Sequence, residues 1–420
     1  MFSFNLLWMR WRWSLFVGAT IFGLISGGIL YPVLWRVLGV GASPPAFSDM
    51  EALLAAGEAW VAGHDPYLTP NHFDSFGRPH IYGPAWLLTG LFGFTVAHIA
   101  EFGVLLLMVF LGGLAYWFRP HNARMAAGAL AVMLAPSILL GLERANNDLF
   151  ILTLISFAAL LSRRDERLST LGVTLLLASA AWLKIYPLVA GLALLTLPGG
   201  FRLAVERLIL WGLLTVTGFA LYAFDYLRLL KNVPVEQSVF SYDLRYAFWI
   251  SVGGAGGRGW AWAGALLVAV GFTAMVWRYW RDYWHGLPLT GPWAFFTVSS
   301  ASIWVGCLLA NPSYPYRSVW VLPLLAWVAA TGAMRPAACR ALIGCLLCFL
   351  WLWWIQWQCY HTLVEPHPGK YESLWLFVLG ATQNSVLLTT GLVAWLLLGW
   401  GWRRLRSLVP PSAVGSASVT

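Results

Sequence analysis

Long apolar stretches separated by short polar segments dominate the chain. Each stretch is bounded by charged residues, Gly or Pro. Because a helix of about 20 mostly apolar residues crosses the hydrocarbon core of a bilayer, the pattern predicts an all-α polytopic membrane protein with about 12 transmembrane helices, between about 10 and 13, in one domain over residues 1–420. The predicted helices span residues 14–34, 98–118, 124–142, 147–162, 169–183, 185–198, 208–224, 260–277, 289–310, 318–333, 341–358 and 374–400.

Two neighbouring runs, 169–183 and 185–198, are each too short for a full span. Arg167 precedes the pair and Arg202 follows it. Since basic residues favour the cytoplasmic side of a membrane, both flanks are expected on that side, with the chain turning near Lys184. The pair therefore predicts a hairpin or re-entrant segment that ends inside the protein, where irregular backbone is tolerated.

Composition agrees with lipid as the main solvent. Of the 420 residues, 60% are hydrophobic and 10% are charged, whereas a soluble domain carries roughly 25% charged residues. A transmembrane barrel is not expected, because its ten-residue alternation of apolar and polar positions is absent. The five cysteines lie mostly inside apolar runs, so neither a disulfide framework nor a zinc site is expected.

The net charge of +9 has an uneven distribution that predicts the topology. With the N-terminus inside, the inner segments hold 16 of the 26 Lys and Arg residues and four acidic residues, so they carry +12 and the rest of the chain −3. This positive-inside pattern predicts two cytoplasmic termini, with residues 403–420 as a cytoplasmic tail, in the plasma (inner) membrane of a bacterium. It explains the basic charge without nucleic acid as a partner.

Three long polar segments are expected to face outward, at residues 36–83, 225–259 and 359–373. The inner loops are short and carry no glycine-rich phosphate-binding motif, so nucleotide chemistry is not supported. The first outward segment predicts a structured extracytoplasmic loop, in which Ser48-Asp49 opens a short amphipathic helix with either residue as its N-cap.

Further polar groups are predicted on the same outer face, at residues 143–148, 184–187 and 311–317. Charged side chains near membrane depth cost several kcal/mol unless they are paired or hydrated, and they are therefore functional candidates. Together with the first loop, these groups predict a shared cavity.

The order of these motifs resembles the GT-C glycosyltransferases, and most closely glycosyltransferase family 87, the polyprenol-phosphate-mannose-dependent mannosyltransferase-like enzymes. Members of that family often carry a His after the proline of the late outward loop, and Arg317 stands nearest to that position here. The matching segments, within residues 45–320, are Ser48-Asp49, Gly63-His64-Asp65-Pro66-Tyr67, Tyr82-Gly83-Pro84, Gly141 with Asn146-Asn147-Asp148, Leu183-Lys184-Ile185-Tyr186-Pro187, and Asn311-Pro312-Ser313.

The resemblance implies an inverting transfer of a sugar, mannose or another hexose, from a polyprenyl-phosphate donor to an extracytoplasmic glycolipid or glycan acceptor. It implies Asp49 as the catalytic base, which takes the proton of the acceptor hydroxyl as that oxygen attacks the anomeric carbon. The leaving phosphate needs its charge neutralised, for which Arg144, Lys184 and Arg317 are expected.

The remaining polar residues of the outer face are expected to bind the substrate. His64 and His80 are candidates for sugar hydroxyls or a divalent metal. No HxxxH or DxD spacing occurs, so no metal and no other cofactor is expected. The expected substrate-binding residues are His64, Asp65, Tyr67, His80, Tyr82, Asn147 and Asp148.

Simpler roles exist for the acidic residues. Asp49 and Asp148 each fit a helix cap, Asp65 before Pro66 fits a turn, and Asp74 fits a loop carboxylate. Two other functions also remain open. A flippase or transporter for lipid-linked sugars would carry paired broken helices in its two halves, and a lipid-linked glycan polymerase or ligase usually has its long loop late in the chain.

Overall fold

A computed structural model of the chain describes residues 31–41, 45–118, 123–163, 167–232, 263–279 in part, 289–310, 315–331 and 336–408. All regular secondary structure in these ranges is helical, which confirms the all-α class. The first half comprises α2 (Tyr31–Val37), α3 (Ser48–Val61), η2 (Pro84–Leu87), α4 (Leu88–Leu91), η3 (Val96–His98), α5 (Ile99–Trp117), α6 (Ala123–Met133), α7 (Pro136–Glu143), α8 (Asn147–Leu161), α9 (Arg167–Leu183) and η4 (Tyr186–Thr196). The second half comprises α10 (Phe201–Leu221), α11 (Ala223–Asn232), α14 (Gly291–Ala310), η5 (Pro315–Val321), α15 (Leu322–Thr331), α16 (Pro336–Gln358), η6 (Cys359–Val364) and α17 (Glu372–Leu408).

Several of these helices have the length and apolarity to cross a membrane. Within the described ranges, four segments meet both requirements, and α7 with α8 forms a fifth if the pair, bent by 97°, counts as one broken span. The helical membrane class is therefore supported, whereas a number near twelve stays a prediction. The predicted helix 14–34 lies mostly outside the described residues. The four segments are Val96–Trp117, Phe201–Leu221, Arg340–Val364 and Glu372–Leu408.

One predicted helix is divided, and another is longer than predicted. The predicted helix 124–142 is divided into α6 and α7, because Pro136 begins α7 and forces Ala135 into extended backbone (φ −61°, ψ 132°). At the other end of the chain, α17 continues to Leu408, so the predicted tail 403–420 begins inside a helix. Of the predicted loop 225–259, only the part within α11 is described.

The predicted hairpin is confirmed, with its turn at Lys184. The returning segment η4 is a 3₁₀-helix, which rises about 2.0 Å per residue, so its eleven residues reach about 22 Å, nearly the ~26 Å of the seventeen-residue α9. At the far end of the pair, Arg207 Nη1 donates to the Pro198 carbonyl at 2.6 Å, and Arg167 and Arg207 line one cavity.

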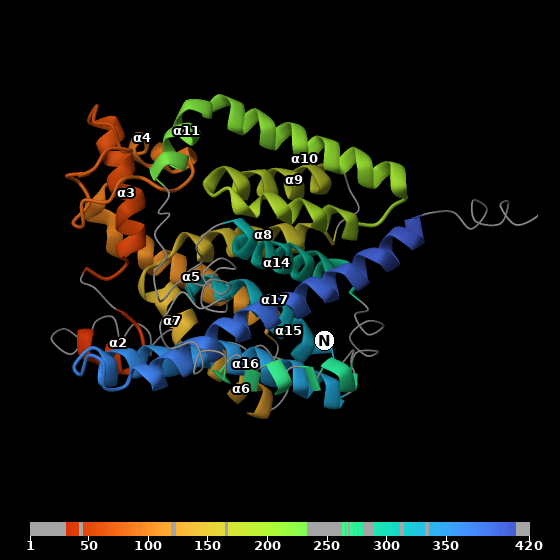
Figure 1. Cartoon of the computed structure of the whole chain (residues 1–420). Coiled ribbons are helices and arrows are strands. Elements are labelled where there is room, and N and C mark those ends of the chain that lie inside the picture. The colour runs from red at the N-terminus through yellow and green to blue at the C-terminus, as the bar shows by residue number, and fades with distance from the viewer. Residues whose placement is uncertain are drawn as a thin grey trace, which may run out of the picture.

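Three of the predicted inner cations lie at one end of the helices. Arg404 of α17 donates to the carbonyls of Leu195 (2.7 Å) and Leu197 (2.8 Å), and Arg207, which donates to the carbonyl of Pro198, lines a cavity with Arg167. In Figure 1, α3 and α4 lie at the opposite end, next to α11. The separation matches the charge pattern of the sequence, and which end faces the cytoplasm stays a prediction.

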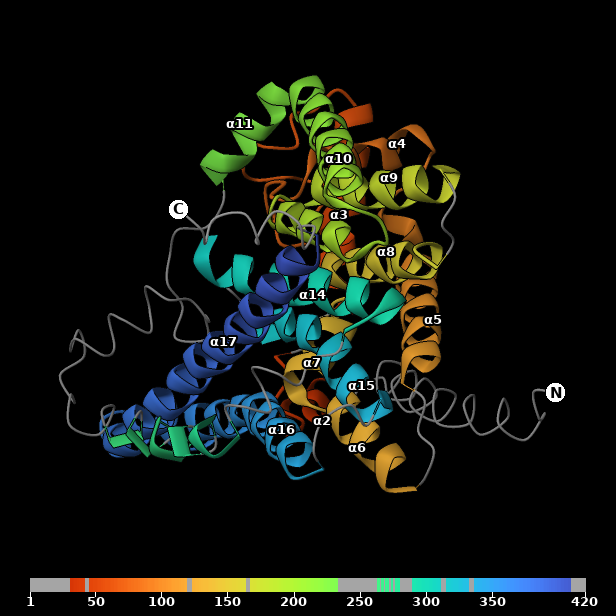
Figure 2. The same ribbon diagram turned by 90° about the vertical axis from the view of Figure 1, so that its right-hand side faces the viewer.

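Helix α14 lies in the interior. It packs against η4, α8 and α17, and Figure 2 shows it between α8 and α17. Its Trp304, Phe295 and Phe296 are buried. Trp304 therefore serves core packing.

A close approach between the first loop and α9 fixes the position of Tyr82. Gly83 N donates to the Leu183 carbonyl at 2.8 Å. A Cβ added to Gly83 would lie 1.9 Å from the Trp182 carbonyl oxygen, so no larger residue fits without movement of the backbone. The loop can therefore place Tyr82 beside the turn at Lys184 only with glycine at position 83.

We expect Gly83→Ala to lower the free energy of unfolding by about 1–3 kcal/mol, because the methyl group overpacks the contact with α9. Thermal unfolding of the purified protein in detergent measures the effect. Gly112→Ala is the matched control, because a Cβ there meets nothing within 4 Å. Equal melting temperatures for the two variants would contradict the prediction.

Candidate functional site

The start of α3 is fixed against the turn between α7 and α8. Phe47 N donates to the Glu143 carbonyl (2.9 Å), and Asp49 N donates to the Arg144 carbonyl (3.1 Å). Phe47 has φ 66° and caps α3 without a side-chain hydrogen bond, so Ser48 and Asp49 are not the N-cap. The Asp49 side chain is thereby available for other contacts.

Asp49 is 5% exposed, and the two oxygens of its carboxylate make different contacts. Oδ2 accepts a hydrogen bond from Asn146 Nδ2 at 2.5 Å. Oδ1 lies 3.7 Å from Arg78 Nη1 and 3.8 Å from Arg144 Nη1, which are ion-pair distances beyond hydrogen-bond range. None of the described residues donates a hydrogen bond to Oδ1.

Asn146 joins this carboxylate to the start of α8. Its side-chain oxygen accepts from Asp148 N at 2.9 Å, which makes Asn146 the N-cap, while its amide nitrogen donates to Asp49. The cap role suggested for Asp148 is therefore wrong. One asparagine both starts α8 and orients the Asp49 carboxylate.

Asp148 forms a second charged centre with the hairpin turn. Its Oδ1 accepts from Lys184 Nζ at 2.8 Å and from the Tyr186 hydroxyl. Lys184 Nζ also lies 5.3 Å from the ring centroid of Tyr82, and the Arg317 guanidinium lies 4.9 Å from that of Tyr186. Side chains from α8, the hairpin turn, the first loop and η5 thus meet at one place.

Two tyrosines lie near both carboxylates. Tyr82 and Tyr316 are buried, and each lies within electrostatic range of both Asp49 and Asp148. Burial, followed by the nearby Asp49 charge, raises the pKa of Tyr82 well above its usual value. The Tyr82 phenol is therefore protonated at neutral pH and is able to donate a hydrogen bond.

Several buried polar atoms at these centres lack a partner among the described residues. They are both side-chain atoms of Asn147, Oδ2 of Asp148 and Nε of Arg144. Buried polar atoms in folded proteins are normally paired, so a group of unpaired ones beside two carboxylates indicates a site that binds a polar ligand.

The structure does not bring every predicted residue to these centres. Asp65 accepts from Tyr67 N (3.0 Å) and pairs with Arg228 of α11 (3.0 Å), which is the turn role given as its alternative. His64 is exposed, with its ring 5.7 Å from that of Phe73.

Two other predicted residues, Tyr67 and His80, form a row of rings with Tyr82. The rings of Tyr67 and His80 are 5.6 Å apart, and those of His80 and Tyr82 are 6.1 Å apart. His80 is buried, and its Nε2 lies 3.3 Å from the Gly83 carbonyl. Among the described residues, no three His, Cys, Asp or Glu side chains form a group able to hold a metal.

Sequence reasoning missed two contacts of Asp49. The sequence pattern includes Asn146 only as part of a motif and gives Arg78 no role. Arg78 is held by Asp74 through Nη2 (2.6 Å) and Nε (3.0 Å), and it donates to the Ser48 carbonyl (2.7 Å). Asp74 is thus the loop carboxylate expected for it. Its position four residues before Arg78 is the signal in the sequence that could have indicated the pair.

The described helices and these contacts define a helical membrane protein with buried carboxylates and cations at one end of its helices. Comparisons of the chain with protein-family models, with curated proteins and with solved structures found no match. The functional assignment therefore depends on the residues and their geometry.

We expect Lys184→Met to destabilise the protein by about 3–5 kcal/mol, because the fully buried Asp148 loses its cation. The double variant with Asp148→Asn should recover most of that loss, since no buried charge is left uncompensated. Thermal unfolding of the single and double variants tests this. Additive losses in the double variant would rule out the pairing.

Because His80 is buried, we expect the free energy of unfolding to fall in acid. Burial lowers the pKa of His80 to about 4, below its usual value. Below pH ~6.5 the unfolded chain therefore binds a proton at His80, whereas the folded chain stays unprotonated there until about pH 4. About 3 kcal/mol of the free energy of unfolding is lost as the pH falls from ~6.5 to ~4. Melting temperatures across this range should fall more steeply for the unmodified protein than for His80→Asn, and parallel curves would contradict the prediction.

Proposed function

We propose that this chain is a membrane-embedded glycosyltransferase. It transfers a hexose, mannose by default, from a polyprenyl-phosphate donor to a glycolipid or glycan acceptor outside the bacterial plasma membrane, with inversion at the anomeric carbon. The observation that carries the proposal is the Asp49 carboxylate, which has one oxygen fixed by Asn146 and the other open between two guanidiniums.

The geometry of Asp49 suits a general base. Asn146 holds Oδ2, which sets the orientation of the carboxylate, and Oδ1 keeps its lone pairs for an incoming hydroxyl. As the acceptor oxygen bonds to the anomeric carbon, its proton moves to Oδ1 and the bond from that carbon to the phosphate oxygen breaks. The carboxylate acts on the face opposite the leaving phosphate, as inversion requires.

The cations predicted to bind the leaving phosphate differ in their availability. Lys184 is already compensated by Asp148 at 2.8 Å. Arg144 touches Asp49 only at 3.8 Å, its side chain is 33% exposed and its Nε has no partner among the described residues. Arg144 is therefore the first candidate for the phosphate, because a guanidinium offers two parallel donors to phosphate oxygens.

The Asp148 centre fits the sugar better than the phosphate. The carboxylate of Asp148, the amide of Asn147 and the phenol of Tyr82 are neutral or acidic groups able to bond to hydroxyls. Two of them have atoms without a partner among the described residues. Arg317, stacked on Tyr186, completes this side and lies within electrostatic range of Asp148.

The test is a transfer assay with the purified protein in lipid nanodiscs, given polyprenyl-phosphate mannose and other hexose donors together with a membrane glycolipid extract. We expect Asp49→Asn to lower transfer by about 10²–10⁴-fold, because the amide cannot take the proton, while the donor still binds. Glu58→Gln is the matched control. It lies on the same helix, and its new side chain can still accept from Val96 N.

Transfer by Asp49→Asn at the rate of Glu58→Gln would exclude Asp49 as the base. Movement of the lipid-linked sugar between leaflets by the unmodified protein, without any transfer, would instead favour a flippase.

A further inference from the structure

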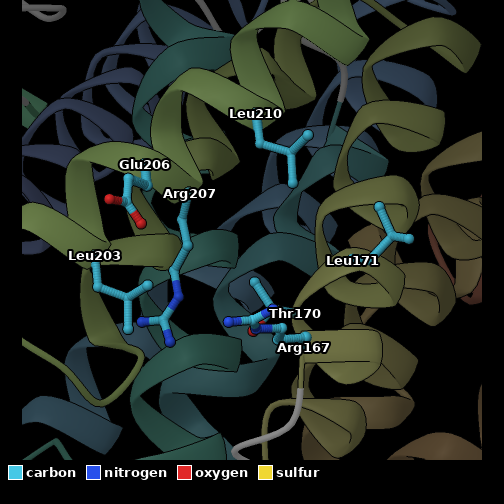
Figure 3. Close-up of a pocket in the computed structure, with 7 residues that line it drawn as sticks. All are labelled: Arg167, Thr170, Leu171, Leu203, Glu206, Arg207 and Leu210. Atoms are coloured by element: carbon cyan, nitrogen blue, oxygen red, sulfur yellow. The ribbon is translucent and has the colours of Figure 1, made fainter.

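A cavity of about 450 Å³ lies between α9 and α10, at the end of α9 opposite to Lys184 (Figure 3). Its size is within the range of small-molecule sites. The glycosyltransferase proposal does not use it. The lining residues are Arg167, Thr170, Leu171, Leu203, Glu206, Arg207 and Leu210.

Two cations from different helices line this cavity. Figure 3 shows the side chains of Arg167 and Arg207 reaching into it, with Thr170 near Arg167. Arg207 is 4% exposed, and its bond to the Pro198 carbonyl fixes its direction. The negative charge of Glu206 is compensated by Arg202 at 2.9 Å. The cavity therefore presents the guanidiniums of Arg167 and Arg207 and the Thr170 hydroxyl to a ligand.

The rest of the lining is apolar. Leu171, Leu203 and Leu210 point toward the cavity from the two helices (Figure 3). Leu171 and Leu203 are 40% and 39% exposed, and Leu168 beside them is 79% exposed. A ligand that fits has an anionic group between the arginines and an apolar part along the leucines.

The position of the cavity agrees with the headgroup level of a bilayer. The seventeen residues of α9 place it about 26 Å from the Asp148–Lys184 pair, which approaches the ~30 Å thickness of the hydrocarbon core. Arg404 lies at the same end, bound to the end of η4. Basic pockets between transmembrane helices on the cytoplasmic side bind anionic lipid headgroups.

We propose that this cavity binds the headgroup of an anionic phospholipid. Arg167 and Arg207 hold the phosphodiester oxygens by charge-assisted hydrogen bonds, Thr170 adds a hydroxyl, and the acyl chains follow the leucines. The lipid joins α9 to α10 and so supports the hairpin whose turn carries Lys184. This holds whether or not the chain transfers sugars.

The test measures lipid binding by the purified full chain in neutral detergent, with phosphatidylglycerol, phosphatidylcholine and inorganic phosphate as separate probes, by thermal shift and native mass spectrometry. We expect phosphatidylglycerol to raise the melting temperature and to bind in a 1:1 complex, while phosphatidylcholine and inorganic phosphate have little effect. Arg167→Gln should weaken phosphatidylglycerol binding roughly five- to tenfold.

Arg167 is the residue to change because it is exposed at the start of α9, so its removal leaves the packing intact. The lipid-free melting temperature of Arg167→Gln checks this. Arg163→Gln is the matched control, since Arg163 is exposed at the same end and stacks on Tyr116 outside the cavity. Undiminished binding by that control supports the site.

Three results would overturn the proposal. Equal stabilisation by the two lipids would show that the charge of the headgroup is not recognised. Saturation by inorganic phosphate at the lipid's affinity would make the cavity a site for a soluble anion. Equal loss of binding in Arg163→Gln would assign the effect to general surface charge.

Discussion

Two of the buried carboxylates, those of Asp49 and Asp148, impose the constraint on which the rest of this structure depends. A charge that leaves water must find cations and hydrogen-bond donors, or the fold loses several kcal/mol. Asp49 finds Asn146, Arg78 and Arg144, and Asp148 finds Lys184 and Tyr186. These partners come from the first loop, the bend between α7 and α8 and the hairpin turn.

The backbone meets that constraint with few special features. Phe47 turns the chain into α3 with a positive φ, and Gly83 lets the loop touch the end of α9. The 3₁₀ winding of η4 lets a short segment run back along α9. Each feature places one charged or polar side chain, so the order of the site follows from the packing of the helices around it.

Much of this arrangement can be predicted from the sequence, for physical reasons. The positive-inside pattern separates the two ends of the helices, and it required the chain to return between Arg167 and Arg202, as it does. The same pattern predicts the remaining charges at the other end, and so predicts Asp49, Asp148 and Lys184 on one face. The resemblance to a known family gave them roles that stay a proposal.

The rest depends on contacts that no local pattern encodes. Asp49 and Asp148 both match a helix cap by position, yet Phe47 and Asn146 take those places because the start of α3 rests on the α7–α8 turn. The role of Arg78 requires the loop from Asp74 to fold back onto α3. Asp65 lies in the same loop as Asp49, but its turn directs it to Arg228 of α11.

An experimental structure with a non-transferable phosphonate analogue of the donor and a bound acceptor tests the central claim most directly. The proposed mechanism predicts the acceptor hydroxyl within about 3.2 Å of Asp49 Oδ1. It also predicts the phosphonate against the Arg144 guanidinium on the opposite side of the anomeric carbon. An analogue bound elsewhere, or an acceptor hydroxyl facing another carboxylate, would contradict it.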